Sequence, residues 1–315
     1  MSGQGARVQV AAGAGISTPV AAGQARVAAR LARQRLFVWF GLLLAAVVMG
    51  FPLLWMVLSS VKVDADLFAV PPVWVPRRLT WDHYGYAFKA APFGRYFLNS
   101  LLTASAGTLL NVMACAMAGY TFAKFRFRGR EPLFYALIGT MMVPFHVILI
   151  PLFLVARYMP LAGGNNLWGV GGTGLLNTYP GLLLPHLVPP FGIFLMRQFF
   201  LSIPDDLMEA GRIDGASEGR IFASIVLPLT KPALATLGIF SFSMIWDDFL
   251  WALVVTTEPL MRTVQLGLQV FQSQYTVAWG PLMAATTVVT LPLLAAFLLG
   301  QRHFIQGIAS SGLKG

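Results

Sequence analysis

Uncharged apolar runs dominate the sequence, and several are long enough to cross the hydrocarbon core of a bilayer. The run from Leu36 to Ser60 contains no charged residue, and a helical span needs about 20 mainly apolar residues. Over the whole chain, 57% of residues are hydrophobic and only 11% are charged. A soluble domain cannot bury that much apolar surface. The sequence therefore predicts an all-α polytopic membrane protein.

Six transmembrane helices are predicted, in one domain covering residues 36–300. The first run lacks the short apolar core and small-residue cleavage site of a secretory signal, so we interpret it as an uncleaved span. The fourth run contains four prolines and is expected to be a kinked helix, because proline frees backbone carbonyls that must find other partners. The six expected spans are residues 36–60, 96–120, 132–156, 179–196, 232–256 and 281–300.

The basic residues predict how the chain lies in the membrane. Residues 1–35 contain five arginines and no acid, which predicts a disordered basic tail, and residues 301–315 form a second tail. Lys and Arg accumulate in cytoplasmic loops. The expected cytoplasmic segments hold 15 of the 22 basic residues (five, four, four and two in 1–35, 121–131, 197–231 and 301–315). We therefore expect both termini on the cytoplasmic face of the membrane, and the net charge of +10 does not indicate nucleic-acid binding.

The most polar stretch between the apolar runs, residues 203–230, predicts a helix-turn-helix on the cytoplasmic face. Ser202 and Asp205 are typical of a helix start, and Asp214-Gly215 is typical of a break before a second helix. Residues 197–231 carry five acids against four bases, whereas the other expected cytoplasmic segments are basic. Membrane topology does not require these acids, but binding to a basic partner surface would. The alternative is an amphipathic interfacial helix that only anchors the loop.

This stretch resembles the cytoplasmic loop of the permease subunits of binding-protein-dependent ABC importers, whose pattern is E-A-A-x3-G-x9-I-x-L-P. Gly211 replaces the second alanine. In that family the loop is the coupling helix, which sits in a cleft of the ATPase subunit. The resemblance thus implies an ATPase-coupling role for Glu209, Ala210, Gly211, Asp214, Gly215, Ile225, Leu227 and Pro228.

Other segments are similar to the carbohydrate branch of that family, of the maltose or multiple-sugar type. They include IDGAS at 213–217, WDDFLWALV at 246–254 and GPLMAA at 280–285. The resemblance covers residue 36 to the end. It implies a passive pathway subunit, not an enzyme, that moves a sugar or oligosaccharide. Such a subunit lies in the lipid of a prokaryotic plasma membrane and forms a heterodimer with a second permease. Its other implied partners are two ATP-binding subunits and an extracytoplasmic sugar-binding protein. The alternatives are a permease for a non-sugar solute and a self-contained secondary transporter, which would show an inverted repeat.

Asp247 and Asp248, within the fifth expected span, are candidates for the solute pathway. A carboxylate in hydrocarbon is costly and should face a wet cavity or a partner. Trp246 and Trp251 bracket them and offer aromatic faces to sugar rings. The alternative is a cap at the membrane boundary, with the tryptophans at headgroup level. In the second span Asn99, Thr103 and Asn111 either line the same path or bond between helices.

No catalytic, metal or cofactor site is predicted. His186 stands alone among prolines without metal-ligand spacing, and we interpret it as a hydrogen-bonded packing residue. The Asp247-Asp248 pair is the only paired acid site, and we expect it to lack a basic or metal-binding companion. The resemblance to the importer permeases implies that ATP hydrolysis takes place on a partner subunit.

Overall fold

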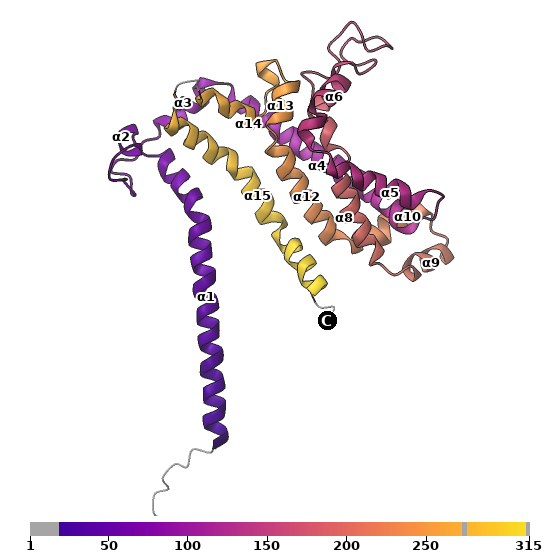
Figure 1. Cartoon of the computed structure of the whole chain (residues 1–315), viewed down its shortest axis with the longest axis horizontal. Coiled ribbons are helices and arrows are strands. Elements are labelled where there is room, and N and C mark those ends of the chain that lie inside the picture. The colour runs from indigo at the N-terminus through magenta and orange to yellow at the C-terminus, as the bar shows by residue number, and fades with distance from the viewer. Residues whose placement is uncertain (1–18, 273–275, 313–315) are drawn as a thin grey trace, which may run out of the picture. The chain divides into compact units, whose positions relative to one another are not determined.

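The computed structural model describes residues 19–272 and 276–312, and its named elements within these ranges are all helices (Figure 1). This confirms the all-α class. Three helices are long and apolar enough to cross a membrane, and the number rises to six if each of three sharply bent helix pairs is counted as one span. The chain divides into two units, residues 1–55 and 56–315, which are described separately.

The first unit consists of most of helix α1, Pro19–Ser60, which carries the first expected span. The helix begins at Pro19 rather than at Leu36, so the expectation of a disordered tail is wrong for residues 19–35. These residues are mainly Ala, Arg, Gln and Leu, which are good helix formers, and they extend a helix whose costly nucleus already exists in the apolar run. The rest of the predicted tail, residues 1–18, lies outside the described residues.

The second unit is built around α4, which packs against α8 and α12 (Figure 1). The helices after α1 are α2 (Asp64–Leu67), α3 (Asp82–Ala90), α4 (Phe93–Lys124), α5 (Arg130–Gly139), η1 (Thr140–Met142), α6 (Phe145–Arg157), α7 (Tyr179–Leu183), η2 (Leu184–His186), α8 (Pro190–Leu201), α9 (Asp206–Ile213), α10 (Glu218–Ile221), η3 (Phe222–Val226), α11 (Leu227–Leu229), α12 (Lys231–Trp246), α13 (Leu250–Val255), η4 (Pro259–Met261), α14 (Val264–Gly267), η5 (Leu268–Phe271) and α15 (Trp279–Gly312).

Glycines on α4 let the neighbouring backbones come close. A Cβ at Gly119 would lie 2.7 Å from the Cβ of Met196 and 2.9 Å from the backbone nitrogen of Arg197, so any side chain there would push α8 away. A Cβ at Gly107 would lie 2.7 Å from side-chain atoms of both Ile245 and Leu183. Small residues at helix contacts are the usual way to gain packing in lipid, where no hydrophobic force holds helices together. The buried Cys115 lies in this contact region.

The third and fourth spans are broken helices. The third span turns by 105° between η1 and α6, although we expected it to be continuous over 132–156. Pro144 explains the break, because it lacks an N–H and forces Val143 into an extended conformation. The fourth span bends by 53° at residues 187–189, as its prolines predict.

The fifth and sixth spans also differ from the expected ranges. The fifth is interrupted at residues 247–249, between α12 and α13, so the two acids sit at a helix break rather than inside a continuous helix. The sixth, α15, continues to Gly312. The expected tail at 301–315 is therefore helical up to residue 312, because Gln301 and the residues after it include no proline to stop the helix. Residues 313–315 lie outside the described part.

Candidate coupling surface and pathway cavity

Helix α9 ends in a backbone arrangement that requires a glycine at position 215. Asp206 and Glu209 lie in its first turn, near the positive end of the helix dipole. At its end, the backbone N–H of Gly215 donates to the carbonyl of Arg212 and that of Ala216 to the carbonyl of Gly211, each at 3.0 Å. This is the Schellman pattern, which places its C′ residue in the left-handed region. Gly215 has φ +76°, as we expected for the break after α9.

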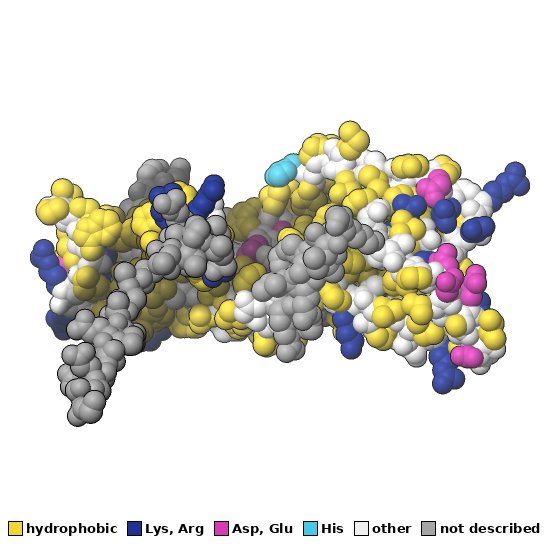
Figure 2. Space-filling view, turned by 90° about the horizontal axis from the view of Figure 1, so that it is seen from below, with side chains coloured by type: hydrophobic (Ala, Val, Ile, Leu, Met, Phe, Trp, Pro, Cys, Tyr) yellow, Lys and Arg dark blue, Asp and Glu magenta, His cyan; other side chains and the backbone are white. Residues whose placement is uncertain are grey.

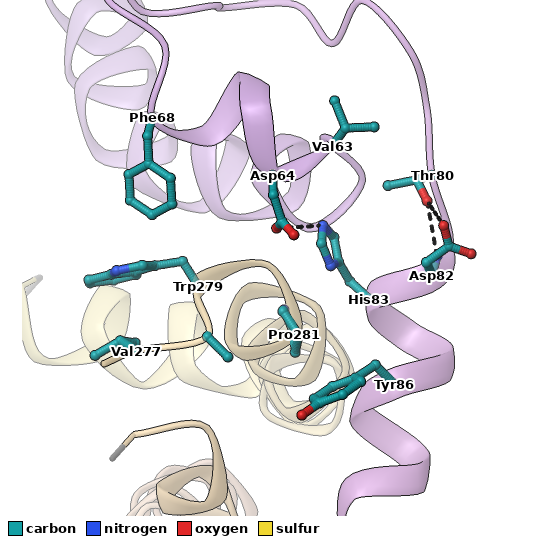
Figure 3. Close-up of a pocket in the computed structure, with 11 residues that line it drawn as sticks. Val63, Asp64, Phe68, Thr80, Asp82, His83, Tyr86, Val277, Trp279 and Pro281 are labelled. Atoms are coloured by element: carbon teal, nitrogen blue, oxygen red, sulfur yellow. Dashed lines mark hydrogen bonds and ion pairs between the residues drawn. The ribbon is translucent and has the colours of Figure 1, made fainter. Parts of the chain in front are cut away.

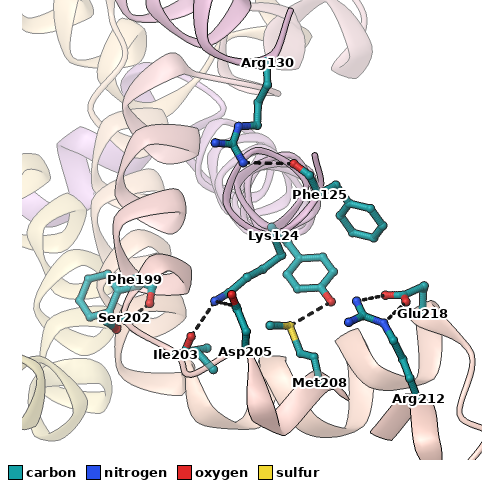
Figure 4. Close-up of polar contacts among 11 residues, drawn as sticks. Lys124, Phe125, Arg130, Phe199, Ser202, Ile203, Asp205, Met208, Arg212 and Glu218 are labelled. Carbon is teal, nitrogen blue, oxygen red and sulfur yellow. Dashed lines mark hydrogen bonds and ion pairs between the residues drawn. The ribbon is translucent and has the colours of Figure 1, made fainter. Parts of the chain in front are cut away.

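Polar contacts tie the start of α9 to the end of α4 (Figure 4). The Nζ of Lys124 donates to Oδ1 of Asp205 and to the carbonyl oxygen of Ile203, both at 2.6 Å, and the Lys124 side chain is only 6% exposed. This hydrogen bond lowers the pKa of Asp205 below its ordinary value. The hydroxyl of Tyr120 donates to the sulfur of buried Met208 at 3.5 Å. These contacts hold the start of α9 against the end of α4.

An ion pair joins α9 to α10 (Figure 4). The Arg212 guanidinium donates to both carboxylate oxygens of Glu218, from Nε at 2.6 Å and from Nη2 at 3.3 Å. The hydrogen bond from Arg212 lowers the pKa of Glu218. The hydroxyl of Ser217 accepts from the backbone N–H of Arg220 at 3.4 Å and caps α10. The two short helices therefore form one unit around the turn at Gly215.

The inner side of the α9–α10 pair packs against the core, and its outer side is exposed to solvent. A Cβ at Gly211 would lie 3.0 Å from Ile225 and 3.2 Å from Ile221, so the glycine lets α9 lie close over the second helix. Ile225 and Leu227 are half-buried and pack against the core. On the outer side Glu209, Ala210, Asp214, Gly215 and Pro228 are exposed, and Ile213 is 86% exposed. Figure 2 shows acidic and basic side chains gathered at the end of the molecule that carries α9 and α10.

A cavity of about 490 Å³ lies among α4, α6, α8 and α12. Most of its wall is apolar, including Phe145, Phe191 and Met244. Its polar groups come from three different spans and are Asn111, His186, Ser241 and Asp248. A mainly apolar cavity with a few converging polar groups is the usual form of a ligand site.

The centre of these polar groups is a contact between His186 and Asp248. The Nε2 of His186 lies 2.8 Å from Oδ2 of Asp248, and both side chains are 15% exposed. The contact joins the break in the fourth span to the break in the fifth. The other oxygen of Asp248 accepts from the backbone N–H of Trp251 at 3.1 Å, at the start of α13. The sequence-based statement that the acid pair lacks a basic companion is therefore wrong, because the companion lies 62 residues away in the chain.

Asn111 connects this contact to the second span. Its Nδ2 donates to the carbonyl oxygen of His186 at 2.7 Å, and its Oδ1 accepts from the hydroxyl of Ser241 at 2.9 Å. Asn111 is buried on α4 and Ser241 is buried on α12. One continuous polar network, Ser241–Asn111–His186–Asp248, thus links three spans at the cavity wall. Sequence reasoning missed Ser241, since a single serine in an apolar run carries no local signal.

The tryptophans among the pathway candidates lie in packed surroundings. Trp246 and Trp251 are 1% and 0% exposed, and their indole N–H groups donate to the carbonyls of Val289 and Gly181. These positions do not support the hypothesis that their rings face a solute. Asp247 is exposed and accepts a hydrogen bond from Gln265 at 2.9 Å.

Of the other second-span candidates, Asn99 bonds to neighbouring segments and Thr103 bonds within α4. Asn99 is fully buried, donates to the carbonyls of Leu260 and Arg262, and accepts from the hydroxyl of Tyr179. Thr103 donates to the carbonyl of Asn99. The contacts of Asn99 favour the alternative of bonds that hold the segments together, whereas the bond of Thr103 stays within one helix.

Comparison with known proteins identifies the family. Residues 111–310 match the family described as the binding-protein-dependent transport system inner membrane component. The chain belongs to this family. Across the described residues, no group of three or more His, Cys, Asp or Glu side chains could hold a metal ion.

Relatives of this protein align with most of its chain. The arabinooligosaccharides transport system permease protein of Halalkalibacterium halodurans is 32% identical over 278 residues, covering 87% of this chain and 95% of that protein. The sn-glycerol-3-phosphate transport system permease protein of Yersinia enterocolitica is 32% identical, with 86% and 94% covered. A chain of a bacterial ABC transporter involved in the import of the acidic polysaccharide alginate has the same fold, with a TM-score of 0.71, 23% identity, and 87% and 97% covered.

Proposed function

We propose that this inner membrane component is the permease subunit of an ATP-driven importer for a sugar or oligosaccharide. Its family and the arabinooligosaccharides permease among its relatives support this substrate class. The Yersinia relative is named for sn-glycerol-3-phosphate, so a phosphorylated polyol is the second candidate. The subunit forms the pathway and does not hydrolyse ATP itself.

The proposed partners are a second permease, two ATP-binding subunits and an extracytoplasmic sugar-binding protein. The observation that carries the coupling role is the exposed outer face of α9 on a helix fixed to α4 through Lys124 and Asp205. A closing ATPase that pushes on Glu209 and Ala210 would move α4 with it. The excess of acids in residues 197–231 favours a basic or N–H-rich cleft on the ATPase.

The proposed orientation has α9 and both termini in the cytoplasm. The positive-inside distribution supports it, with four basic residues between Lys124 and Arg130 beside the end of α4. The start of α4, the short helices α2 and α3, and the segments before α15 then face outward.

The proposed path for the solute runs past the Ser241–Asn111–His186–Asp248 network. A hydroxyl-rich neutral solute needs both donors and acceptors, and this network offers a hydroxyl, an amide, an imidazole and a carboxylate. Asp248 disfavours a strongly anionic solute unless the second permease supplies a compensating cation.

Uptake into proteoliposomes tests this function. The tagged chain is purified with its partner subunits, reconstituted with the binding protein, and given radiolabelled sugars or sn-glycerol 3-phosphate. We expect uptake of a neutral sugar that needs both ATP and the binding protein. Uptake by this chain alone, without ATP, would identify a secondary transporter, and uptake of only the phosphorylated polyol would overturn the sugar assignment.

A further inference from the structure

Figure 3 shows a second cavity, of about 570 Å³. It lies at the end of α4 opposite to α9. Helix α3 ends just before the first residue of α4, Phe93, whereas Lys124 at the other end of α4 contacts the start of α9. The cavity is formed by residues of α2, α3 and the first turn of α15. In the proposed orientation it opens to the outside of the cell.

Aromatic rings and carboxylates line this external cavity. Phe68, Tyr86 and Trp279 are 67%, 59% and 44% exposed. The side chain of Asp64 is 81% exposed, and Figure 3 shows its carboxylate between Trp279 and His83. Asp82 adds a second carboxylate at the rim, where it accepts a hydrogen bond from the hydroxyl of Thr80 at 2.7 Å.

The walls of the external cavity are held in place by His83. This residue is buried, and its Nε2 lies 2.7 Å from the carbonyl oxygen of Lys62 and 3.7 Å from Oδ1 of Asp64. Its ring packs directly over Gly280, where a Cβ would overlap the imidazole. Trp279 precedes Gly280 in the chain, so this contact fixes the position of Trp279 relative to α3. The site is built before any partner arrives, which lowers the ordering cost of binding.

The chemistry of the lining fits a cationic group. Carboxylates pair with guanidinium or ammonium groups, and aromatic faces attract the same cations. The exposure of the site indicates whether the cation belongs to a free small molecule or to a protein side chain. A free small ligand is usually enclosed over about 70–90% of its surface, whereas Asp64 and the aromatic rings remain widely exposed. A side chain carried by a protein suits such an open site, because its backbone and neighbours cover the rest.

We propose that the external cavity is the docking point for an arginine or lysine side chain of the extracytoplasmic binding protein. The inference rests on the proposed function, because it takes its partner from the binding-protein-dependent family and its side of the membrane from the proposed orientation. It adds the docking residues on this chain and the charge of the group they receive.

The test measures the affinity of the assembled transporter, in nanodiscs, for the labelled binding protein that stimulates its ATPase. Asp64→Asn and Trp279→Ala should each raise the Kd about fivefold or more, from the loss of an ion pair or a cation–π contact. Asp64→Asn should also weaken the dependence of Kd on salt. Glu258→Gln is the matched control, because Glu258 is exposed and lies outside the cavity lining. A Kd within about twofold of wild type in both cavity variants would overturn the proposal.

A small-molecule probe separates charge from shape. N-acetyl-argininamide should compete with the binding protein, whereas N-acetyl-citrullinamide, which has nearly the same shape and no charge, should not. Equal competition by both would overturn the cation assignment. Failure of Asp64→Asn to assemble with the second permease would instead assign the cavity to the contact between permeases and also overturn the proposal.

The same preparation distinguishes this inference from the proposed function. If the binding protein stimulates the wild-type ATPase and the cavity variants keep their affinity, only the docking proposal fails. If no external binding protein stimulates the wild-type complex, the proposed function fails and the docking proposal fails with it.

Discussion

Gly215→Val should abolish transport and the stimulation of ATPase activity by the binding protein, while the chain still inserts and assembles. Gly215 has φ +76° and closes α9 through the bonds from its own N–H and from that of Ala216. A non-glycine residue in the left-handed region costs roughly 1–2 kcal/mol, and a β-branched residue more. Among the residues that the structure describes, no atom outside the local chain lies within 4 Å of a Cβ placed there. The effect is therefore on the backbone turn and not on packing.

Gly219→Val is the control for this variant. Gly219 is also exposed, a Cβ placed on it would likewise meet open space, and it lies in α10 without a positive φ. It should keep nearly normal stimulation. The measurements are ATPase activity with and without the binding protein, uptake, and recovery of the complex from membranes. Normal stimulation and uptake in Gly215→Val would show that the α9 turn only anchors the loop.

Asp248→Leu should lower uptake by about tenfold or more, far beyond any loss of assembled complex. Removing one partner of a mostly buried ionisable pair leaves the other unpaired, at a cost of about 3–5 kcal/mol in well-buried cases. Here it removes the contact that joins the breaks of the fourth and fifth spans through His186. Asp248→Asn keeps the shape and one possible hydrogen bond to His186, so it should retain part of the uptake.

Asp247→Leu is the comparison variant, because it removes the neighbouring acid, which is exposed and accepts from Gln265, and leaves the His186–Asp248 contact in place. The readout is uptake of a panel of radiolabelled sugars, each normalised to recovered complex. A role in the pathway predicts that the loss differs from one sugar to the next. A loss that follows the amount of recovered complex for every sugar would make the His186–Asp248 contact purely structural.

Local sequence patterns predicted the parts of the fold that depend on local physics. The length of the apolar runs predicted the helical class, and the prolines predicted the bend in the fourth span. Asp214-Gly215 predicted the end of α9. These features depend on hydrophobicity and backbone angles within a few residues. The sharp turn at Pro144 depended on the same physics and was missed, because proline is also tolerated inside membrane helices.

The pathway site was less predictable, because its key contacts join residues far apart in the chain. No local pattern pairs His186 with Asp248 or Asn111 with Ser241. The sequence suggested that the rings of Trp246 and Trp251 contact the solute, but their indole N–H groups donate to backbone carbonyls inside the protein. An intramembrane acid signals a special site from sequence alone. Which neighbours it uses is decided by tertiary packing.

Cross-linking from α9 to an ATPase subunit tests the coupling role most directly. A single cysteine replaces the exposed Ala210 in a Cys115→Ala background, and a second variant carries its cysteine at the exposed Glu258 instead. After treatment of membranes with a short thiol-to-amine cross-linker, we predict an adduct of position 210 with an ATP-binding subunit, and none from position 258. Absence of any ATPase adduct at 210 in the assembled complex, or an equal adduct from 258, would contradict the assignment of α9 as the coupling helix.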